Sequence, residues 1–426
     1  MTTETGRSRR DLRRELHRHP EPAWCEFYTT ARVVEECRRI GVDELHVGPD
    51  AIDADARMAV PDEDTLAEWF ERALADGADE DILAQLEGGH TGAVAVLHRG
   101  DGPTVGLRVD IDALQIREAD TDGHRPAAEG FRSDHEGYMH ACGHDGHTTI
   151  GLGVLEAVAD SDFQGTLKVV FQPAEERVGG GRAVAESGHL DDVDYLYAVH
   201  LGLDHPSGEV VAGIDDFLAV SHVLAEFEGE SAHAGAHPEQ GRNAVQAMAA
   251  AIQNLYAIPR HEEGATRVNA GRAGGGTATN IVPEEAFVEG EVRGETTELM
   301  QYMKDHAERV IRSAADMHDC DVTLSTEGQA PSARSDQPLV DAFAAEAAGV
   351  DGVDRVVERD ALGGSEDATY LMKRVQEHGG LACYVCVGTD HPGGHHTPTF
   401  DVDEESLAVG IDALTRSIQR VAARRP

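Results

Sequence analysis

Four apolar runs in this chain are each followed by residues that can bind a metal ion. The residues in these places are Asp110 and Asp112, Glu175 and Glu176, His200, and His396. In an open α/β sheet, binding groups lie beyond the carboxyl ends of the strands. If the four runs are strands, segments far apart in the chain deliver polar groups to one edge of a sheet. The sequence therefore predicts a site built at that edge.

The spacing of apolar residues supports such a sheet. Strands and helices alternate in the first half of the chain, which predicts an α/β domain around a largely parallel sheet. The predicted helices span residues 9–19, 30–41 and 147–159, and the predicted strands span 94–100, 104–112, 167–172 and 195–202. Pro20 and Gly41 stop the first two helices. Residues 62–87 are acidic and helical in pattern, and they are expected to be an insertion packed on this domain.

The pattern changes between residues 217 and 330. The predicted order there is βαββαβ, which is that of a ferredoxin-like split unit. This unit interrupts the α/β pattern, so we expect an inserted lid domain over 217–331. The first domain would then be discontinuous, formed by 1–216 and 332–426.

The charge of the chain is extreme. The formal net charge is −43 and there are three lysines, Lys168, Lys304 and Lys373. One interpretation is a surface adapted to molar salt, where the Debye length is about 3 Å and like charges repel weakly. The other is an acidic face for a basic partner. Nucleic-acid binding is disfavoured because there is no basic stripe. No apolar stretch is long enough to span a membrane and the start is unlike a signal peptide, which favours a cytoplasmic protein, here in a high-salt cytoplasm.

The six cysteines are scattered and do not resemble a disulfide framework. Cys383 and Cys386 form a C-x-x-C, but in an apolar run that is expected to be a buried strand. Cys142 is different, because it lies in HACGHDGH, two residues before His144. In extended or loop backbone this spacing points both side chains the same way. The alternative, a surface loop rich in histidine, is weakened by the neighbouring predicted strands.

Thiolate, imidazole and carboxylate ligands together suit zinc, manganese or cobalt. The adjacent carboxylates of Glu175 and Glu176 suggest a division of work: one binds metal, while the other takes a proton from a water and passes it to a leaving amine. A solvated acidic turn is the alternative for this pair. In the predicted lid, His233, Asn280 and Arg293 are individually more typical of structural residues. Together they would suit a pocket for a substrate carboxylate or oxyanion.

With these motifs in place, the sequence resembles the aminoacylase/carboxypeptidase-G family of di-metal amidohydrolases over nearly its whole length. The similarity is greatest to the branch with an H-x-C-G-H-D-x-H motif, and within it to the aminobenzoyl-glutamate hydrolase A-subunit group. The stretches that carry it are RMAVPDE, LEGGHTG, LRVDIDAL, MHACGHDGHT, FQPAEE, LDDVDY, HAGAHPEQGRNA, GSEDAT, and GHH before TFDVDEE.

The resemblance implies two divalent metal ions, zinc or manganese with cobalt as a further option, and a role for each matching residue. The implied metal ligands are Cys142, His144, Glu176, His200 and His396, with Cys142 bridging the metals. Glu175 would be the general base and Asp112 a supporting residue. The implied lid also dimerises, with His233 reaching a neighbouring subunit's site and Asn280 and Arg293 contacting substrate.

The expected activity is hydrolysis of an N-acyl amino acid amide, with p-aminobenzoyl-glutamate as the preferred substrate. A hippurate or indole-acetyl-amino-acid hydrolase is the alternative. Thr397 and Pro398 follow the paired histidines where the A-subunit group has Asn-Glu, while the insertion at 50–92 favours that group. A homodimer is expected. A heterodimer with a homologous subunit, in which this chain is non-catalytic, is the competing hypothesis from another class.

Overall fold

The computed structural model describes residues 8–423, which divide into two compact units. The first unit contains the chain up to Asp215, Ala333–Leu362, and the chain from Asp367 onward. The second contains Asp216–Ser332 together with the short return Gly363–Glu366. A catalytic role for the first unit and a lid role for the second remain predictions.

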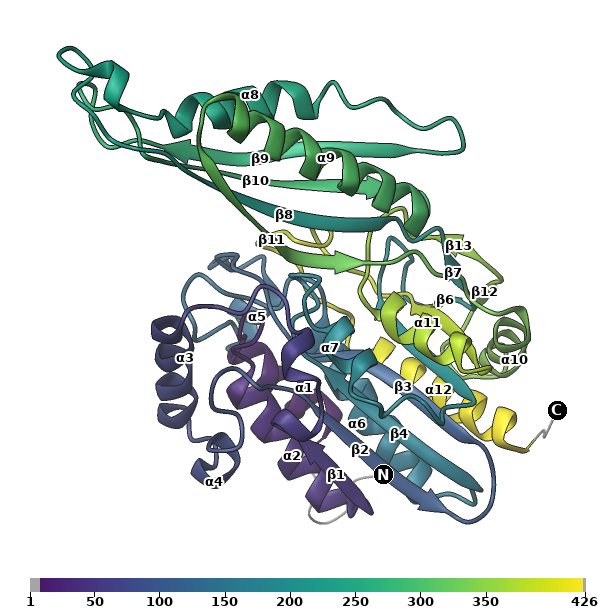
Figure 1. Ribbon diagram of the computed structural model, residues 1–426. Helices are drawn as coiled ribbons and strands as arrows, with labels where there is room; N and C mark the ends of the chain where they lie inside the picture. The colour runs from purple at the N-terminus through teal and green to yellow at the C-terminus, as the bar shows by residue number, and fades with distance from the viewer. Residues whose placement is uncertain (1–7, 424–426) are drawn as a thin grey trace. The chain divides into compact units, whose positions relative to one another are not determined.

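The first unit is built on an eight-stranded sheet with the order β1-β2-β4-β3-β5-β14-β6-β12 (Figure 1). Its strands are β1 (Glu44–Val47), β2 (Ala93–Arg99), β3 (Thr104–Asp110), β4 (Gly165–Gln172), β5 (Tyr195–Leu201), β6 (Glu209–Val211), β12 (Arg355–Val357) and β14 (Leu381–Val387). The central strands β4, β3, β5 and β14 are parallel, whereas β1, β2 and β6 pair antiparallel to β2, β4 and β14, respectively. The predicted largely parallel sheet is therefore confirmed at its centre.

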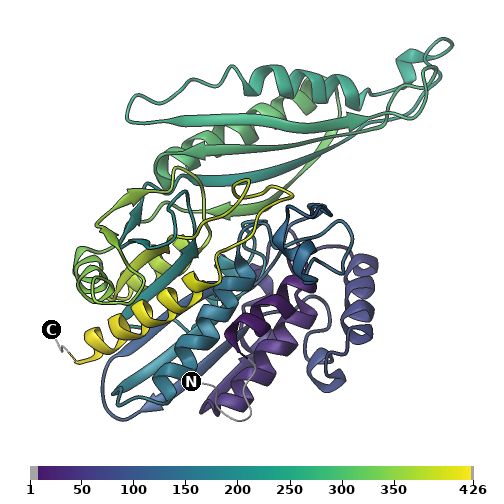
Figure 2. The same ribbon diagram turned by 180° about the vertical axis from the view of Figure 1, so that it is seen from behind.

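Helices cover both faces of this sheet, as Figures 1 and 2 show together. The helices are α1 (Arg9–Arg18), α2 (Phe27–Ile40), α5 (Arg125–Glu129), α6 (His144–Ala159), α7 (Gly181–Glu186), α10 (Gln337–Ala347), α11 (Ala368–Glu377) and α12 (Glu405–Ala423). Helix α6 packs against α1, α2 and α12, and α7 packs against α11. Helix α2 ends at Gly41, whose φ of 83° is the left-handed conformation that glycine adopts readily.

The acidic segment after residue 60 forms two helices, α3 (Glu63–Ala75) and α4 (Glu80–Leu83). Asp62 and Asp79 begin them, and each carboxylate accepts a hydrogen bond from a backbone N–H group in the first turn. Leu66 and Trp69 of α3 are buried in a cluster with residues of α2. The segment is therefore packed on the first unit, as predicted.

The second unit has the order β8 (Ala219–Glu228), α8 (Ala244–Leu255), β9 (Thr266–Gly275), β10 (Glu285–Gly294), α9 (Thr297–Met317), β11 (Asp321–Ala330). Its antiparallel sheet runs β11-β8-β10-β9. Apolar residues of α8 and α9 share one core with the strands. This arrangement is the predicted ferredoxin-like βαββαβ unit.

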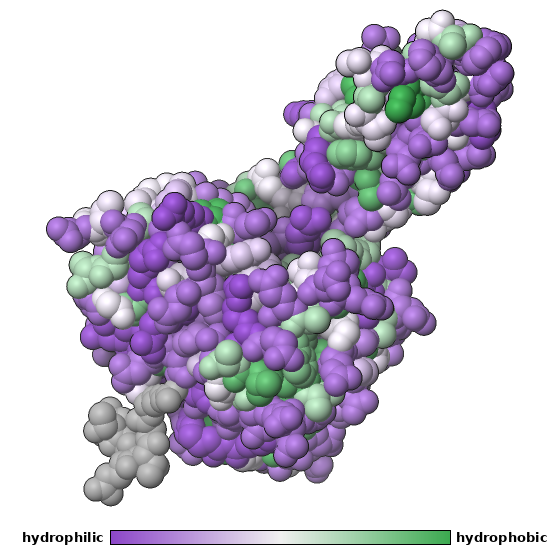
Figure 3. Space-filling view, turned by 90° about the vertical axis from the view of Figure 1, so that its left-hand side faces the viewer, coloured by the Kyte–Doolittle hydropathy of each residue, from purple (hydrophilic) through white to green (hydrophobic). Residues whose placement is uncertain are grey.

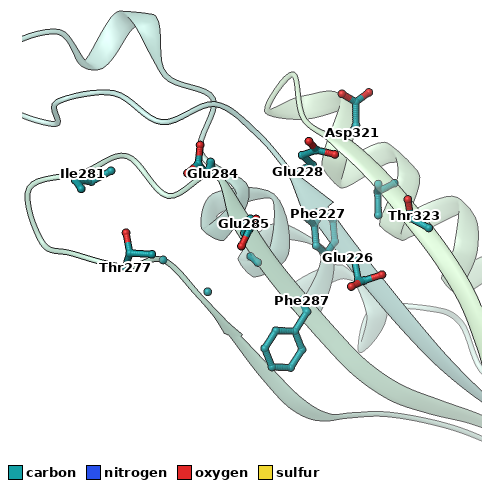
Figure 4. A pocket seen from close by; sticks show the side chains of 14 residues that line it. Glu226, Phe227, Glu228, Thr277, Ile281, Glu284, Glu285, Phe287, Asp321 and Thr323 are labelled. Carbon is teal, nitrogen blue, oxygen red and sulfur yellow. The ribbon is translucent and has the colours of Figure 1, made fainter. Parts of the chain in front are cut away.

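One hollow of the second unit, about 550 Å³ in volume, is lined by carboxylates (Figure 4). We call five of these side chains the lid carboxylates: Glu226, Glu228, Glu284, Glu285 and Asp321. All five are exposed. The face of the molecule in Figure 3 is likewise mostly hydrophilic. The lid carboxylates are therefore one place where acidic side chains gather at an exposed surface.

Within the described residues, no helix is both long enough and apolar enough to cross a membrane. The six cysteines all lie in the described part of the chain, where they are buried and unbridged. Cys383 and Cys386 lie on the buried strand β14 and donate hydrogen bonds to backbone carbonyl oxygens of Ala212 and Gly202. The predicted buried strand for this pair is confirmed.

Candidate metal centre

The structure brings the predicted ligands of the first unit together. Among the described residues, five groups of side chains have their donor atoms within 4.8 Å of one another, and three of these groups consist of predicted site residues alone. They are Cys142 with His144 and His200, Cys142 with Glu176 and His396, and Glu175 with Glu176 and His144. Cys142 belongs to two of the groups, which places its sulfur between two sets of donors. The arrangement would allow two adjoining sites that share the Cys142 sulfur.

Several of these residues lie at a strand end or a helix start. His200 belongs to β5, the glutamate pair follows β4, and His144 is the first residue of α6. Gly143 precedes that helix with a φ of 88°, a conformation that glycine adopts without strain. The backbone N–H of His396 donates to the carbonyl oxygen of Ala141, at 2.8 Å, which holds the C-terminal loop against the Cys142 segment.

Hydrogen bonds select the nitrogen that each histidine can offer to a metal. His200 Nδ1 lies 2.7 Å from the carbonyl oxygen of Leu201, so it carries the proton and leaves Nε2 as the donor atom. That Nε2 lies 3.5 Å from Cys142 Sγ. His144 Nδ1 lies 3.1 Å from Asp112 Oδ1, an arrangement typical of a metal-binding histidine held by a carboxylate. His144 Nε2 then faces Glu175 and Glu176, at 3.9 and 3.7 Å.

His147 stands beside these ligands, but both of its nitrogens are already engaged. Its Nδ1 lies 2.5 Å from Asp110 Oδ1, and its Nε2 accepts a hydrogen bond from the N–H of Leu201 at 2.8 Å. A ring that accepts at one nitrogen and donates from the other is neutral and fully occupied. His147 therefore ties α6 to the end of β5, next to His200, and acts as a support for the site.

Two neighbouring histidines, His391 and His395, could replace His396 as a ligand by sequence alone, but they make other contacts. His395 Nε2 lies 3.1 Å from the carbonyl oxygen of Leu201, and the rings of His391 and His395 contact each other. His396 Nε2 lies 3.5 Å from Glu176 Oε2. Of the three histidines in this loop, the structure groups His396 with Cys142 and Glu176.

The electrostatics of the site fit a bound cation. Burial raises the pKa of Glu176 to about 8, and the nearby charges of Asp112 and Asp110 act in the same direction. Burial lowers the pKa of His144, but Asp110, Asp112 and Glu176 outweigh it and raise that pKa to about 10. Among the described residues, both His144 Nε2 and Glu176 Oε1 are buried without a hydrogen-bond partner. A divalent cation between them would satisfy both atoms and compensate the negative charge.

The loop that carries the two glutamates is held by three buried carboxylates, which we call the anchor carboxylates: Glu26, Asp112 and Asp367. Glu26 Oε1 accepts the N–H of Ala174 at 2.7 Å, and Asp112 Oδ2 accepts the N–H of Glu176 at 3.0 Å. Asp367 Oδ2 accepts the N–H groups of Gly180 and Gly181, at 3.1 and 2.7 Å. Backbone groups are thus held at the start, middle and end of residues 174–181.

A buried arginine connects one anchor to the sheet. Arg108 donates to Gln172 Oε1 at 2.8 Å and to Asp110 Oδ2 at 2.8 Å. It also lies 3.3 Å from Asp367 Oδ1, which accepts a second hydrogen bond from Gln172 Nε2 at 2.7 Å. The polar groups behind the ligands are therefore paired with each other, as buried charges require.

In the second unit, two predicted residues lie together and one lies apart. His233 pairs with Ile281 in an isolated bridge, and the N–H of Ala234 donates to the carbonyl oxygen of Asn280 at 2.9 Å. Both His233 and Asn280 are exposed. Arg293 lies near the far end of β10, about 27 Å along the strand from Glu285 at a rise of about 3.4 Å per residue. One copy of this unit does not place the three residues side by side.

Arg293 is already engaged by residues of its own unit. Its Nε and Nη2 each lie 2.9 Å from an oxygen of Glu291, and its Nη1 lies 3.2 Å from Ser365 Oγ. Hydrogen bonds with His222 and Arg293 lower the pKa of Glu291 to about 2, so this carboxylate is ionised. A substrate carboxylate would have to approach the remaining edge of the guanidinium.

Several of these supports have no local sequence signal. Glu26 and Asp367 act through backbone N–H groups 148 and 187 residues away in the chain, and His147 acts through a backbone N–H group of β5. The pattern GSEDAT marked the Asp367 segment as shared with the resembled family but did not indicate what Asp367 contacts.

The fold and the donor set define a metal-dependent hydrolase in which two carboxylates flank the candidate cation sites. The profile of Peptidase family M20/M25/M40 matches residues 106–420. The chain belongs to this family of hydrolases.

Three proteins that are similar to this chain over nearly its whole length can be compared with it. The chain is 48% identical to an indole-3-acetyl-aspartic acid hydrolase of Enterobacter agglomerans, over 94% of this chain and 93% of that protein. It is 44% identical to the A-subunit of p-aminobenzoyl-glutamate hydrolase from Escherichia coli K12, over 95% of this chain and 94% of that protein. The crystal structure of an aminobenzoyl-glutamate utilization protein from Klebsiella pneumoniae superposes with a TM-score of 0.84 at 39% identity, covering 97% and 95% of the two chains.

Proposed function

We propose that this protein hydrolyses the amide bond of an N-acyl amino acid in a metal-dependent reaction. The observation that carries the proposal is the convergence of Cys142, His144, Glu176, His200 and His396, with Glu175 beside them, at the strand ends of one unit. Five donors of mixed type suit two divalent ions, zinc or manganese, with cobalt as a substitute. Membership of a hydrolase family supports the reaction class.

The two glutamates divide the work. Glu176, with 8% of its side chain exposed, faces Cys142 and His396 and suits a ligand. Glu175 is more open, with 12% exposed, and suits a general base that takes a proton from water and returns it to the departing amine. When bound, the metal ions would polarise the amide carbonyl and lower the pKa of a water. Asp112 keeps the Nε2 of His144 directed toward the donors.

The lid residues complete the proposal. The exposed His233 uses Nδ1 to accept N–H groups of Gly235 and Ala236, which leaves Nε2 to donate to an oxyanion. We assign substrate contacts to Asn280 and Arg293. Because Arg293 lies apart from the other two in one copy of the lid, a dimer in which neighbouring subunits contribute different residues fits this assignment.

The preferred substrate is p-aminobenzoyl-glutamate, and the second candidate is indole-3-acetyl-aspartate. Each is the substrate in the name of a relative that is more than 40% identical to this chain over nearly its full length. Each substrate carries an aromatic acyl group on a dicarboxylic amino acid. The shared chemistry therefore includes a second carboxylate on the amino-acid side, while the two substrates differ in the aromatic group and by one methylene in the amino acid.

A non-catalytic role beside a partner is the alternative from another class. One relative is named as a single subunit of its enzyme, which favours a heteromeric assembly as a second hypothesis. The intact donor set and the presence of Glu175 support catalysis by this chain. Comparing the purified chain alone with the chain mixed with a homologous partner separates the two hypotheses.

The first experiment is a substrate panel in about 2–3 M KCl, a range chosen to screen the acidic surface. The panel contains p-aminobenzoyl-glutamate, indole-3-acetyl-aspartate and hippurate, each with Mn²⁺, Zn²⁺, Co²⁺ or EDTA. We expect metal-dependent cleavage that favours the two dicarboxylic substrates. Preference for hippurate would contradict a dicarboxylic substrate but would keep the proposed reaction. No cleavage by folded, metal-loaded protein, with or without a homologous partner, would contradict the proposed activity.

A further inference from the structure

The loop that presents Glu175 and Glu176 has a backbone that needs external support. Ala174 has a φ of 57° and Val178 a φ of 53°, in the left-handed region that residues with a side chain rarely adopt. The carbonyl oxygen of Ala174 accepts the N–H groups of Gly179 and Gly180, at 3.0 and 3.2 Å. Such a conformation persists only where the surroundings determine it.

Glu26 meets that need at the residue before the catalytic pair. Its side chain is buried, and Oε1 accepts the N–H of Ala174 at 2.7 Å. The hydroxyl of Thr91 donates to Oε2 at 2.6 Å, which fixes the second oxygen. With both oxygens engaged, the carboxyl group holds one orientation, and it holds the peptide group between Pro173 and Ala174, which precedes Glu175.

Glu26 lies at the start of α2, where it is unusual for a side chain to bind a distant loop instead of its own helix. A residue at a helix N-terminus commonly accepts N–H groups of its own helix. Glu26 makes no such bond. Glu21 does that work instead, because its carboxylate accepts the N–H groups of Tyr28 and Thr29 at 2.7 and 2.8 Å. The Glu26 side chain is thereby available for the loop.

A second carboxylate holds the other side of Glu175. Asp112 accepts the N–H of Glu176 and contacts the ligand His144. The proposed base therefore sits between two fixed peptides, one held by Asp112 and one by Glu26. A displacement of about 1 Å in a reacting group can lower a rate about 100-fold, so both anchors bear on turnover.

We propose that Glu26 is a positioning residue, which fixes the direction of Glu175 and Glu176 through the N–H group of Ala174. The inference rests on the proposed function, because it concerns how the base and the ligand of that reaction are held. Its side-chain hydrogen bonds go to Ala174 and Thr91, so it would act on the base and the ligand through the backbone.

The test compares substitutions at Glu26 with matched substitutions at Glu21. Both residues are buried carboxylates that accept backbone N–H groups in the same segment, and only Glu26 reaches the loop. The variants are E26L, E26D and E26Q, with E21L and E21D as controls. E26D keeps the carboxyl group and shortens the side chain by one methylene, so it serves if E26L does not fold. Thermal melting and circular dichroism identify a temperature at which every compared variant is folded.

Two measurements report on the position of the loop. The first is the separation of kcat from KM on the substrate that the wild-type protein cleaves. The second is the visible and near-ultraviolet absorption of the Co²⁺-loaded protein, which responds to the geometry of the ligands without any turnover. A residue that only stabilises the fold changes neither at a temperature where the variant is folded.

We expect kcat to fall about 10- to 100-fold in E26L and about 10-fold in E26D, with KM within about threefold of wild type. E26Q keeps an oxygen for Ala174 and should stay within about fivefold. The Co²⁺ spectrum should change in E26L and E26D and remain wild-type in E21L and E21D. Wild-type kcat and spectrum in E26D, or equal changes at both positions, would overturn the inference. If the wild-type protein cleaves no N-acyl amino acid, the proposed function fails, and the Co²⁺ spectra still decide the role of Glu26.

Discussion

The anchor carboxylates of the first unit and the lid carboxylates of the second show two different uses of acidic residues. Each anchor carboxylate is buried and accepts defined N–H groups of one loop. The lid carboxylates line an exposed hollow. A buried carboxylate with fixed partners determines where a backbone lies, whereas an exposed one contributes mainly to the net charge. The formal charge of −43 therefore combines a small structural set with a large solvent-facing set.

The largest effect on activity should come from Glu175, which lies in the loop held by the anchor carboxylates. Glu175→Ala removes the proposed base and leaves the five ligands, so we expect kcat to fall at least about 10³-fold. Metal content, measured on the purified variant by mass spectrometry, should remain that of wild type. Retained turnover would remove Glu175 from the reaction and would weaken the reason for holding this loop so firmly.

Removal of an anchor should cost more stability than removal of a lid carboxylate. Asp367→Ala leaves the N–H groups of Gly180 and Gly181 without their acceptor and removes a partner of Arg108. We expect the free energy of unfolding to fall by about 3–5 kcal/mol, the range for breaking a buried ionic contact. Chemical denaturation in high salt would measure it. The matched control is Asp321→Ala, an exposed aspartate, for which a similar loss would contradict the comparison.

The buried histidine His17 should make the free energy of unfolding depend on pH. Burial and the nearby Arg13 charge lower the pKa of His17, but hydrogen bonds with Asp145 and Glu118 outweigh them and raise it to about 9. The protonated form therefore stabilises the fold fully below pH 6.5, and this contribution is lost as the pH rises through 9. From the shift we expect a loss on the order of 3 kcal/mol.

Denaturation curves at several pH values between about 6 and 10 would measure this loss. His17→Gln has no titrating ring, so its unfolding free energy should change less across the same range. An equal decline in the variant would assign the effect to other groups.

The smallest effect is expected at the lid carboxylates. Replacing Glu226, Glu228, Glu284 and Glu285 with glutamine removes like charges that repel one another in dilute buffer. We expect the melting temperature to rise by about 1–3 °C at low salt, with the difference disappearing near 1 M KCl. Calorimetry across a KCl series would measure it. A lower melting temperature at low salt would indicate a specific role for this hollow.

Much of this arrangement could be predicted from the sequence, because it follows from local patterns. Apolar runs located the central strands, the βαββαβ order identified the second unit, and Gly41 marked the end of α2. Cys142, His144 and the glutamate pair stood out because metal-binding residue types follow strands or lie in a short motif. The antiparallel edge of the sheet, including β1 and β6, was not predicted, because these strands are short and carry little periodicity.

The anchors could not be predicted for a different reason. A hydrogen bond from a backbone N–H to a distant carboxylate has no sequence pattern, since any residue except proline supplies the donor. Glu26 lies four residues before the helix predicted at 30–41 and belongs to no motif, while Asp367 lies in GSEDAT, a pattern that does not indicate its contacts. The separation of Arg293 from His233 and Asn280 also depends on the length of β10, which only the three-dimensional register makes plain.

The anchors come from parts of the chain that are synthesised far apart in time. Glu26 precedes the loop by about 150 residues, while Asp367 follows it by almost 190 and comes after the whole second unit. Closing contacts over such separations is entropically expensive and tends to occur late in folding. During synthesis, Cys142, His144, Glu176 and His200 are therefore made before Asp367, the last anchor of the loop that carries Glu175 and Glu176. Of the proposed ligands, only His396 follows Asp367 in the chain. We therefore expect metal to bind in a finished geometry only after residue 367 has been synthesised, and truncation anywhere before that residue should abolish metal binding.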